Sequence, residues 1–326
     1  MGPPAPSYPP QTRDVTLHPM NEPKPTVSVV IPCHNYGRFL ATAIGSALAQ
    51  TEPPCQIIVV DDGSTDNTRE VAQCYKDSIY YLALPHSGVC RARNEGLLRA
   101  AGDFVIFLDA DDALIPSYIE KTLAAWLLAP NPKPAFVYTQ RCDFDSSTAL
   151  SRYSPFDPTL LKFKNYIMIS ALLRTEIVRE EEFDPTFASG LEDYDFFLSL
   201  VEKGHTGLLL DQPLLRVRAH ESSRNRACRA PTLCWPIMLQ LLRKHGIQYS
   251  LRDRHRFMSD LKMFVANRIK EQRQPTQPTS ARLAALMQMI RYRAPVLDIL
   301  SQLFFIIHRP LPAIPSQSKV DDSCHL

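Results

Sequence analysis

Apolar residues in the first 140 positions follow two alternating patterns. Short, continuous runs rich in β-branched residues are typical of strands buried on both faces of a parallel sheet. Apolar residues spaced three and four apart indicate one buried face of a helix. The predicted strands are 27–31, 57–60, 79–84, 104–108 and 135–139, and the predicted helices are 39–48, 66–76, 89–101 and 117–128. Their alternation with short connections predicts an α/β fold with a doubly wound, mostly parallel sheet flanked by helices.

The periodicity is weaker beyond residue 140. A helix is predicted at 191–203, and short apolar runs follow at 207–210 and 214–218. In the first part of the chain, Asp66 is expected to be the N-cap of the helix 66–76. Further helical patterns lie around 234–245, 251–271 and 280–292. The expected organisation is a disordered Pro-rich N-terminus (1–25), an α/β domain (26–228), a helical basic C-terminal region (229–310) and a disordered tail (311–326).

Charge is distributed unevenly along the 326 residues. The net charge is only +2, but residues 216–293 hold 17 lysines and arginines against 4 aspartates and glutamates. This basic region suits an anionic membrane surface or a phosphate-bearing acceptor, and the alternative is a set of solvated helix faces. No apolar run approaches the roughly 20 residues of a membrane span, and the N-terminus lacks a signal-peptide pattern. A cytoplasmic protein is expected, with peripheral contact at the inner face of a membrane as one option.

The eight cysteines contain no CxxC pair. They are expected to be reduced, mostly packed thiols, since zinc sites require closely spaced ligands.

Polar residues follow three of the predicted strands, as Pro32-Cys33-His34-Asn35, Asp61-Asp62-Gly63-Ser64 and Asp109-Ala110-Asp111-Asp112. Ligands of open parallel sheets bind beyond the carboxyl ends of the strands. Asp109 and Asp111 share one face of an extended chain and repel each other unless a cation lies beside them. Mg²⁺ or Mn²⁺ with a substrate diphosphate fits such ligands. The alternative is an acid-rich turn in which Asp112 caps the next helix.

Asp62 lies where an acid accepts hydrogen bonds from a ribose or a base edge in nucleotide-binding folds. An ordinary turn between strand and helix is the equal alternative. Arg93 is near the start of helix 89–101, where basic groups and the helix dipole favour an anion.

Two acids, Glu192 and Asp193, begin the helix predicted at 191–203. Asp193 is in phase with apolar Phe196, Phe197 and Leu200, and an inward-facing acid is costly unless it has a partner or a function. It is therefore a candidate general base, against the alternative of acids that simply favour a first helical turn. His220 follows the run 214–218 and precedes Ser222, Ser223 and Arg224, which suit phosphate oxygens.

Four sequence blocks together resemble the family 2 glycosyltransferases. They are Val-Ser-Val-Val-Ile-Pro-Cys-His-Asn (27–35), Val-Val-Asp-Asp-Gly-Ser-Thr-Asp (59–66), Ala-Arg-Asn-Glu-Gly-Leu (92–97) and Phe-Leu-Asp-Ala-Asp-Asp (107–112). All four occur in the family's order, and Leu-Glu-Asp-Tyr-Asp (191–195) is similar to its later acidic motif. The resemblance covers roughly residues 26–225.

The resemblance implies a GT-A fold, a nucleotide diphosphate-sugar donor with a UDP-sugar expected, a divalent metal and inversion at the anomeric carbon. It implies a contact of Asp62 with the base, of Asp109 with the ribose side, and of Asp111 with the metal. Asp193 would be the base that deprotonates the acceptor hydroxyl, and His220 a metal or diphosphate contact. The remaining expected donor contacts are Pro32, His34, Asn35, Arg93 and Glu192. His34 departs from the family, which often has tyrosine there, so weaker or pH-sensitive base stacking is expected.

The resulting hypothesis is a single displacement onto a glycan or lipid-linked acceptor in polysaccharide or glycolipid synthesis, with no nucleic-acid partner. One alternative is a nucleotidyltransferase, although such enzymes favour a Gly-rich or basic loop after the first strand and 32–38 has one glycine and Arg38. The other is a non-catalytic module that binds a nucleotide sugar.

Overall fold

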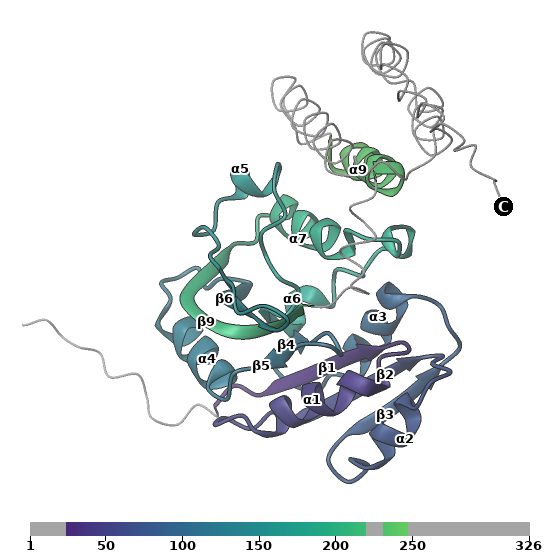
Figure 1. Cartoon of the computed structure of the whole chain (residues 1–326). Helices are drawn as coiled ribbons and strands as arrows, with labels where there is room; N and C mark the ends of the chain where they lie inside the picture. Colours follow the sequence, from purple (N-terminus) through teal and green to yellow (C-terminus); the bar gives the residue numbers. More distant parts are fainter. Residues whose placement is uncertain (1–23, 220–230, 247–326) are drawn as a thin grey trace, which may run out of the picture.

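The computed structural model describes residues 24–219 and 231–246 (Figure 1). Several expectations therefore lie outside the described residues. They are the Pro-rich segment 1–23, His220, the helical patterns at 251–271 and 280–292, and the tail 311–326.

The first half of the domain alternates strand and helix. Its elements are β1 (Val27–Cys33), α1 (Gly37–Leu48), β2 (Gln56–Asp62), α2 (Thr68–Gln73), β3 (Tyr80–Leu84), α3 (Val89–Arg99) and β4 (Phe104–Phe107). These strands pair in parallel in the order β3-β2-β1-β4. The parallel sheet predicted from the hydrophobic runs is therefore present in this half.

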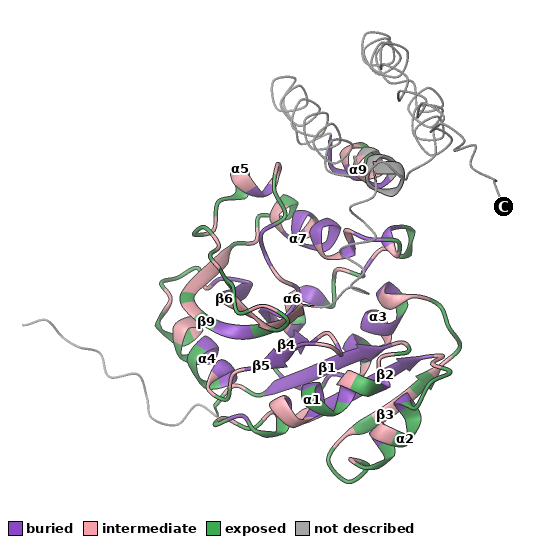
Figure 2. Ribbon diagram, in the orientation of Figure 1, coloured by how far each residue is buried: buried purple, intermediate pink, exposed green. Residues whose placement is uncertain are grey.

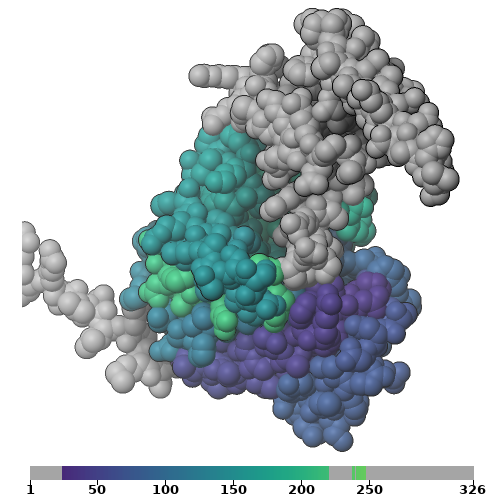
Figure 3. All heavy atoms as spheres, in the orientation of Figure 1, coloured from purple at the N-terminus to yellow at the C-terminus, as the bar shows by residue number. Residues whose placement is uncertain are grey.

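The second half extends the same sheet with mixed pairing. Its elements are β5 (Ala113–Leu114), α4 (Tyr118–Leu128), β6 (Phe136–Asp145), β7 (Leu150–Ser151), α5 (Pro158–Leu161), β8 (Leu172–Arg174), α6 (Thr175–Val178), the 3₁₀ helix η1 (Pro185–Phe187), α7 (Glu192–Glu202), β9 (Gly207–Ala219) and α9 (Pro231–His245). The order continues β4-β8-β6-β9-β5, with β7 on β6, and only β6 and β9 pair in parallel here. In Figure 3, the first half of the domain is coloured purple to blue and the second half mostly teal, and the two occupy separate parts of the surface shown.

Two apolar layers cover the opposite faces of the sheet. Val30 and Phe107 belong to a layer that includes residues of α3 and α7. Val29 and Ile106 belong to another that includes residues of α1 and α4. Successive residues of a strand point to opposite faces, so continuously apolar strands are needed to form both layers, and Figure 2 shows β1 and β2 buried along most of their length.

Three predicted elements differ clearly from the structure. The strand predicted at 135–139 continues to Asp145 as β6. The runs 207–210 and 214–218 form one strand, β9, because register shifts against Thr139–Arg141 of β6 accommodate the polar residues between them. The helix predicted at 66–76 is shorter, Thr68–Gln73, and Asn67 rather than Asp66 is its cap residue. The Asp66 carboxylate instead accepts hydrogen bonds from the backbone amides of Thr68 (3.0 Å) and Gly37 (2.9 Å), which joins α1 to α2.

Among the described helices, none is both long and apolar enough to cross a bilayer. Five cysteines of the described residues before α9 are free thiols, namely Cys33, Cys55, Cys74, Cys90 and Cys142.

Candidate active site

A cavity of about 860 Å³ lies beyond the carboxyl ends of β1, β2 and β4. Its volume is in the range of small-molecule sites. Its lining includes eight of the residues expected from the sequence, namely Pro32, His34, Asp62, Arg93, Asp109, Asp111, Glu192 and Asp193. The fold therefore brings together side chains that are up to 161 positions apart in the sequence.

Asp62 lines the cavity and is the last residue of β2. Its carboxylate accepts hydrogen bonds from the backbone amides of Ser87 (2.7 Å) and Gly88 (2.9 Å). Gly88 has φ +92°, a conformation that favours glycine, and this turn presents its amide to Asp62. A carboxylate offers about four acceptor positions, so the fixed Asp62 side chain keeps capacity for an N–H donor of a ligand.

His34 stacks on His86 beside Asp62, with ring centroids 4.0 Å apart. The Nδ1 atoms of both rings face the backbone carbonyl of Asp62, at 2.8 Å for His34 and 3.0 Å for His86. A carbonyl only accepts hydrogen bonds, so this geometry assigns a proton to each Nδ1 atom. His86 was not predicted as a site residue, although it follows the third strand just as the predicted groups follow theirs.

Asn35 is exposed and lies outside the cavity lining. Its side-chain oxygen accepts a hydrogen bond from the Thr65 amide (2.8 Å), and its side-chain nitrogen lies 3.2 Å from Nε2 of His34. The backbone amide of Asn35 donates to Ser64 (2.9 Å). Asn35 thus joins the loops after β1 and β2 and orients His34, so its direct contact with a donor stays a prediction.

Three acids at the end of β4 form a compact cluster. Carboxylate oxygens of Asp109, Asp111 and Asp112 all lie within 4.8 Å of one another. Asp112 is buried, and burial together with the charges of Asp111 and Asp109 raises its pKa well above the ordinary value. A cation bound to the two half-buried acids would relieve this repulsion, and Mg²⁺ and Mn²⁺ both accept such oxygen ligands. The alternative in which Asp112 caps the next helix does not hold, because the cap residue of α4 is Ser117.

Arg93 is buried, with 1% of its surface exposed, and connects three elements. Its Nη2 atom lies 2.9 Å from Asp109, and its Nη1 atom lies 3.0 Å from Glu192. Burial opposes the charge, but the two carboxylates outweigh it and raise the pKa of Arg93. Both terminal nitrogens thus bind protein acids, and Arg93 fixes the orientation of Asp109 and Glu192 in the cavity wall.

Asp193 lies in the first turn of α7 and is half-buried at the cavity. One carboxylate oxygen accepts hydrogen bonds from the Tyr194 amide (2.7 Å) and the Asn165 side chain (3.2 Å). Burial and the neighbouring charge of Glu192 raise the pKa of Asp193 to about 6, against the opposing effect of Arg93. A carboxylate with this pKa is suited to accept a proton near neutral pH.

The periodicity argument for α7 was incomplete. Phe196, Phe197 and Leu200 are buried as predicted, but so are Tyr194, Asp195 and Leu198, so nearly the whole helix is enclosed. Glu192, one position before Asp193, is buried against Arg93, and Asp195 is more deeply buried than Asp193.

Arg218 at the end of β9 was also not predicted. Its Nε atom donates to the backbone carbonyl of Asp111 (3.1 Å), and its backbone amide donates to the Asp112 carboxylate (3.0 Å). Its guanidinium lies 4.6 Å from the ring centroid of Phe39 and 4.3 Å from that of Phe144. Arg218 therefore holds the acidic turn from β9, and Arg93 holds it from α3.

Comparisons with known proteins identify the family of the chain. The family model described as glycosyl transferase family 2 matches residues 28–178. A putative teichuronic acid biosynthesis glycosyltransferase of Bacillus subtilis, TuaG, is 30% identical over 242 residues, which are 68% of this chain and 90% of that protein. Seven further curated relatives match over shorter stretches, so that the chain spans between 17% and 31% of their own length.

Solved structures share the fold at low sequence identity. The structure of S. aureus TarS 1-349 in complex with UDP-GlcNAc has a TM-score of 0.57 and 16% identity, covering 86% of this chain and 91% of that one. The mannosyltransferase PcManGT of Pyrobaculum calidifontis, in complex with GDP-Man and Mn²⁺, has a TM-score of 0.51 and 15% identity, covering 87% and 85%. The domain matches the GT-A fold of such neighbours, with strands and helices in the same arrangement. The family model, the near full-length relative and the fold together establish that this chain belongs to the family 2 glycosyltransferases.

Proposed function

We propose that this chain is an inverting, metal-dependent glycosyltransferase that moves a sugar from a UDP-sugar to an acceptor hydroxyl. The observation that carries the proposal is that Asp62 after β2, the Asp109–Asp111 turn after β4 and Asp193 on α7 line one cavity. The strand β1 separates Asp62 from this turn, and Arg93 joins the turn to the residue before Asp193. The three groups therefore suit the base, the diphosphate and the reacting sugar of a nucleotide sugar.

Asp62 and His34 form the proposed base-binding end. The Asp62 carboxylate accepts the N–H of a uracil ring, and the Pro32 backbone and the His34 ring lie beside it in the cavity lining. Bound UDP-GlcNAc in the S. aureus TarS structure supports a uridine donor. Bound GDP-Man in the Pyrobaculum enzyme supports the inclusion of other nucleotides in the test.

Asp111, with Asp109 beside it, would hold Mg²⁺ or Mn²⁺, and the ion when bound neutralises charge on the leaving diphosphate. The donor set is appropriate, because hard divalent ions take carboxylate oxygens and keep substrate phosphates as further ligands. Mn²⁺ in the Pyrobaculum complex supports this assignment. His220, the other proposed ligand, lies outside the described residues.

Asp193 is the proposed general base. It accepts the proton of the acceptor hydroxyl while that oxygen bonds to the anomeric carbon, and the bond from this carbon to the diphosphate oxygen breaks. The products are the glycoside with inverted configuration and the nucleoside diphosphate. The raised pKa of Asp193, to about 6, supports the role, because a base is most effective when its pKa is close to the working pH.

The proposed acceptor is a glycan or a lipid-linked glycan in polysaccharide or glycolipid synthesis. The role of the Bacillus relative, described as putative teichuronic acid biosynthesis, supports synthesis of a polysaccharide. Peripheral binding to an anionic membrane is part of the proposal, supported by the excess of lysine and arginine at 216–293. Sedimentation with liposomes tests it: stronger pelleting with anionic than with neutral vesicles is expected, and equal pelleting would remove the electrostatic argument.

The proposal is tested by incubating purified full-length chain with UDP-, GDP-, dTDP- and CDP-sugars and Mn²⁺ or Mg²⁺. The expected result is metal-dependent release of UDP, which is lost in Asp111→Ala and reduced in Asp193→Ala. Release of pyrophosphate would instead indicate a nucleotidyltransferase. Donor binding without turnover, even with candidate glycan acceptors, would indicate a binding module.

A further inference from the structure

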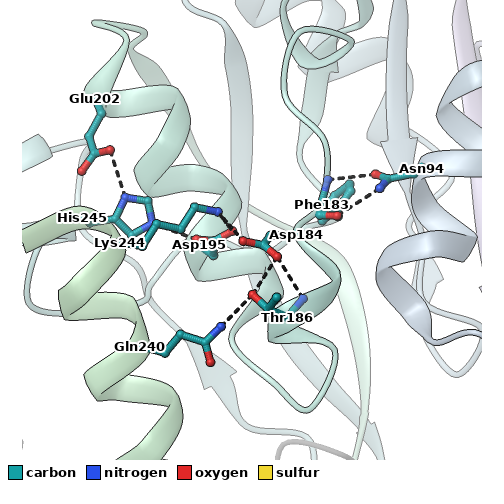
Figure 4. Close-up of polar contacts among 9 residues, drawn as sticks. All are labelled: Asn94, Phe183, Asp184, Thr186, Asp195, Glu202, Gln240, Lys244 and His245. Atoms are coloured by element: carbon teal, nitrogen blue, oxygen red, sulfur yellow. Dashed lines mark hydrogen bonds and ion pairs between the residues drawn. The ribbon is translucent and has the colours of Figure 1, made fainter.

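The last two residues of α9 form an ionic network with α7, in which His245 and Asp195 are buried (Figure 4). His245 is 1% exposed, and its Nε2 atom lies 2.8 Å from a carboxylate oxygen of Asp195. Its Nδ1 atom lies 3.0 Å from a carboxylate oxygen of Glu202. Since a carboxylate attracts only a nitrogen that carries hydrogen, a ring between two carboxylates is stable as the doubly protonated imidazolium.

Lys244 completes the network on the other oxygen of Asp195. Its Nζ atom lies 2.9 Å from Asp195 and 2.9 Å from Asp184, which precedes η1. Asp195 is itself 1% exposed, and each of its two oxygens binds one cation of α9. Two cations of α9 therefore meet three acids, two on α7 and one at η1.

The same helix also holds the segment that leads into α7. The Gln240 side chain donates to Thr186 (2.6 Å), and the Thr186 amide donates to Asp184 (2.9 Å). Residues 188–191, which follow directly, line the cavity. Figure 4 shows these contacts in a row along α9. The helix therefore contacts both the segment that leads into the cavity wall and the helix that carries Asp193.

Asp193 lies between two such anchors. One residue earlier, Glu192 binds Arg93, and two residues later, Asp195 binds Lys244 and His245. The start of α7 has no side-chain cap, and its cap residue Leu191 has the strained φ of +64°. The ion pairs on either side of Asp193 therefore help to set the orientation of this first turn, together with the hydrogen bond from the Tyr194 hydroxyl to the Leu161 carbonyl.

Packing alone does not require these charges. Ile237 and Leu241 of α9 are already buried in the apolar layer that includes α7. Burying ions costs desolvation free energy that their attraction only partly offsets, so a buried ion pair is weak evidence for stability. We infer that these ion pairs instead fix the position of α7 relative to α9.

We propose that Lys244 and His245 are positioning residues for the transfer reaction: through Asp195 they hold the first turn of α7 so that the Asp193 carboxylate faces the acceptor hydroxyl. The role rests on the proposed function, because it assumes that Asp193 accepts the proton. The proposal gives α9 a role in the transfer reaction, although the family motifs of the chain all precede this helix.

A consequence is that the turnover number should fall at high pH, in addition to its rise as Asp193 ionises. Burial opposes the charge of His245, but Asp195 and Glu202 outweigh it, so its pKa lies above the ordinary value. The other charged group beside it is Lys244, which pairs with Asp184. The contribution of His245 is fully present below its ordinary pKa and is lost as the pH rises through the raised one. The turnover number should therefore rise as Asp193 ionises and fall at higher pH as His245 loses its proton.

The test compares full-length His245→Gln, Lys244→Met and Lys244→Arg with the control Lys203→Met. Lys203 follows α7 at its other end and pairs with Glu181.

The kinetics are measured with the donor that is active in the panel. His245→Gln and Lys244→Met are expected to lower kcat by about 10- to 100-fold, as misplacement of a reacting group does. KM for the donor and the calorimetric Kd for UDP should stay within about twofold, as expected for the loss of an interaction made only in the transition state. Lys244→Arg should retain most activity, Lys203→Met all of it, and His245→Gln should lose the high-pH limb.

Hydrogen–deuterium exchange measures the positioning itself without relying on activity. Peptides covering 183–197 should exchange faster in His245→Gln and Lys244→Met, whereas peptides from β1 to β4 should not change. A folded His245→Gln chain with unchanged kcat and unchanged exchange would overturn the proposal, as would equal losses in kcat and in UDP affinity. A wild-type chain that turns over no donor would overturn the proposed function and the catalytic part of this inference. An active wild type with fully active variants would overturn the inference alone.

Discussion

Replacing Arg93 by methionine should destabilise the fold strongly. Methionine has similar length and no charge, so the change leaves the carboxylates of Asp109 and Glu192 without their shared cation. Removing one partner of a buried pair costs about 3–5 kcal/mol, mainly because the other charge stays buried and unpaired. Glu192 should account for most of this loss, since its side chain is 7% exposed, whereas that of Asp109 is 30% exposed and retains some water.

Urea unfolding followed by circular dichroism measures this loss. The matched control is Arg99→Met on the same helix, whose pair with Glu95 spans four residues at the surface and should be worth about 0.3–0.5 kcal/mol. Adding Glu192→Gln to Arg93→Met removes the stranded charge, so the double variant should lose less than the two single losses combined, with a coupling of about 1–3 kcal/mol. A loss for Arg93→Met no larger than for Arg99→Met, or strict additivity with Glu192→Gln, would refute the reasoning.

Three further predictions concern other parts of the domain. Asp193→Asn should lower kcat by about 10²–10⁴ and remove the rise in wild-type activity near pH 6, because the amide cannot accept a proton; a pH profile with that limb intact would assign the base elsewhere. Gly96→Ala should cost about 1–3 kcal/mol in urea unfolding, because the added methyl group would lie 2.3 Å from Val30 in the sheet; no change would mean that β1 and α3 separate easily. Asn94→Ala should cost about 1–3 kcal/mol, because the side chain binds both the amide and the carbonyl of Phe183, and unchanged thermal melting would contradict this.

The sequence predicted the first half of the fold well. The strands β1, β2 and β4 contain continuous apolar runs because these strands are buried on both faces, which leaves a clear signal in the residues themselves. The strands β5 and β7 have two residues each and β8 has three, too few for any periodicity. Their pairing depends on partners that are distant in the sequence. For example, Arg174 of β8 pairs with Phe104 of β4, and a local pattern carries no information about such a partner.

The candidate site was predictable where its residues end a strand or belong to a family motif. Asp62, Asp109 and Asp111 meet in one cavity because the carboxyl ends of parallel strands share one edge of the sheet. Arg218 and His245 were missed because their partners are far away in the sequence: Arg218 binds the carbonyl of a residue 107 positions earlier, and His245 binds an acid 50 positions earlier. An isolated arginine or histidine has no local pattern that predicts such a partner.

The central claim, that the cavity is a metal-assisted nucleotide-sugar site, is tested most directly by calorimetric titration of UDP into the full-length chain with and without Mn²⁺. The account predicts binding that needs the ion and that weakens at least about tenfold in Asp111→Asn, because the ion joins this carboxylate to the diphosphate. Equal UDP affinity with and without Mn²⁺, unchanged in Asp111→Asn, would contradict the account.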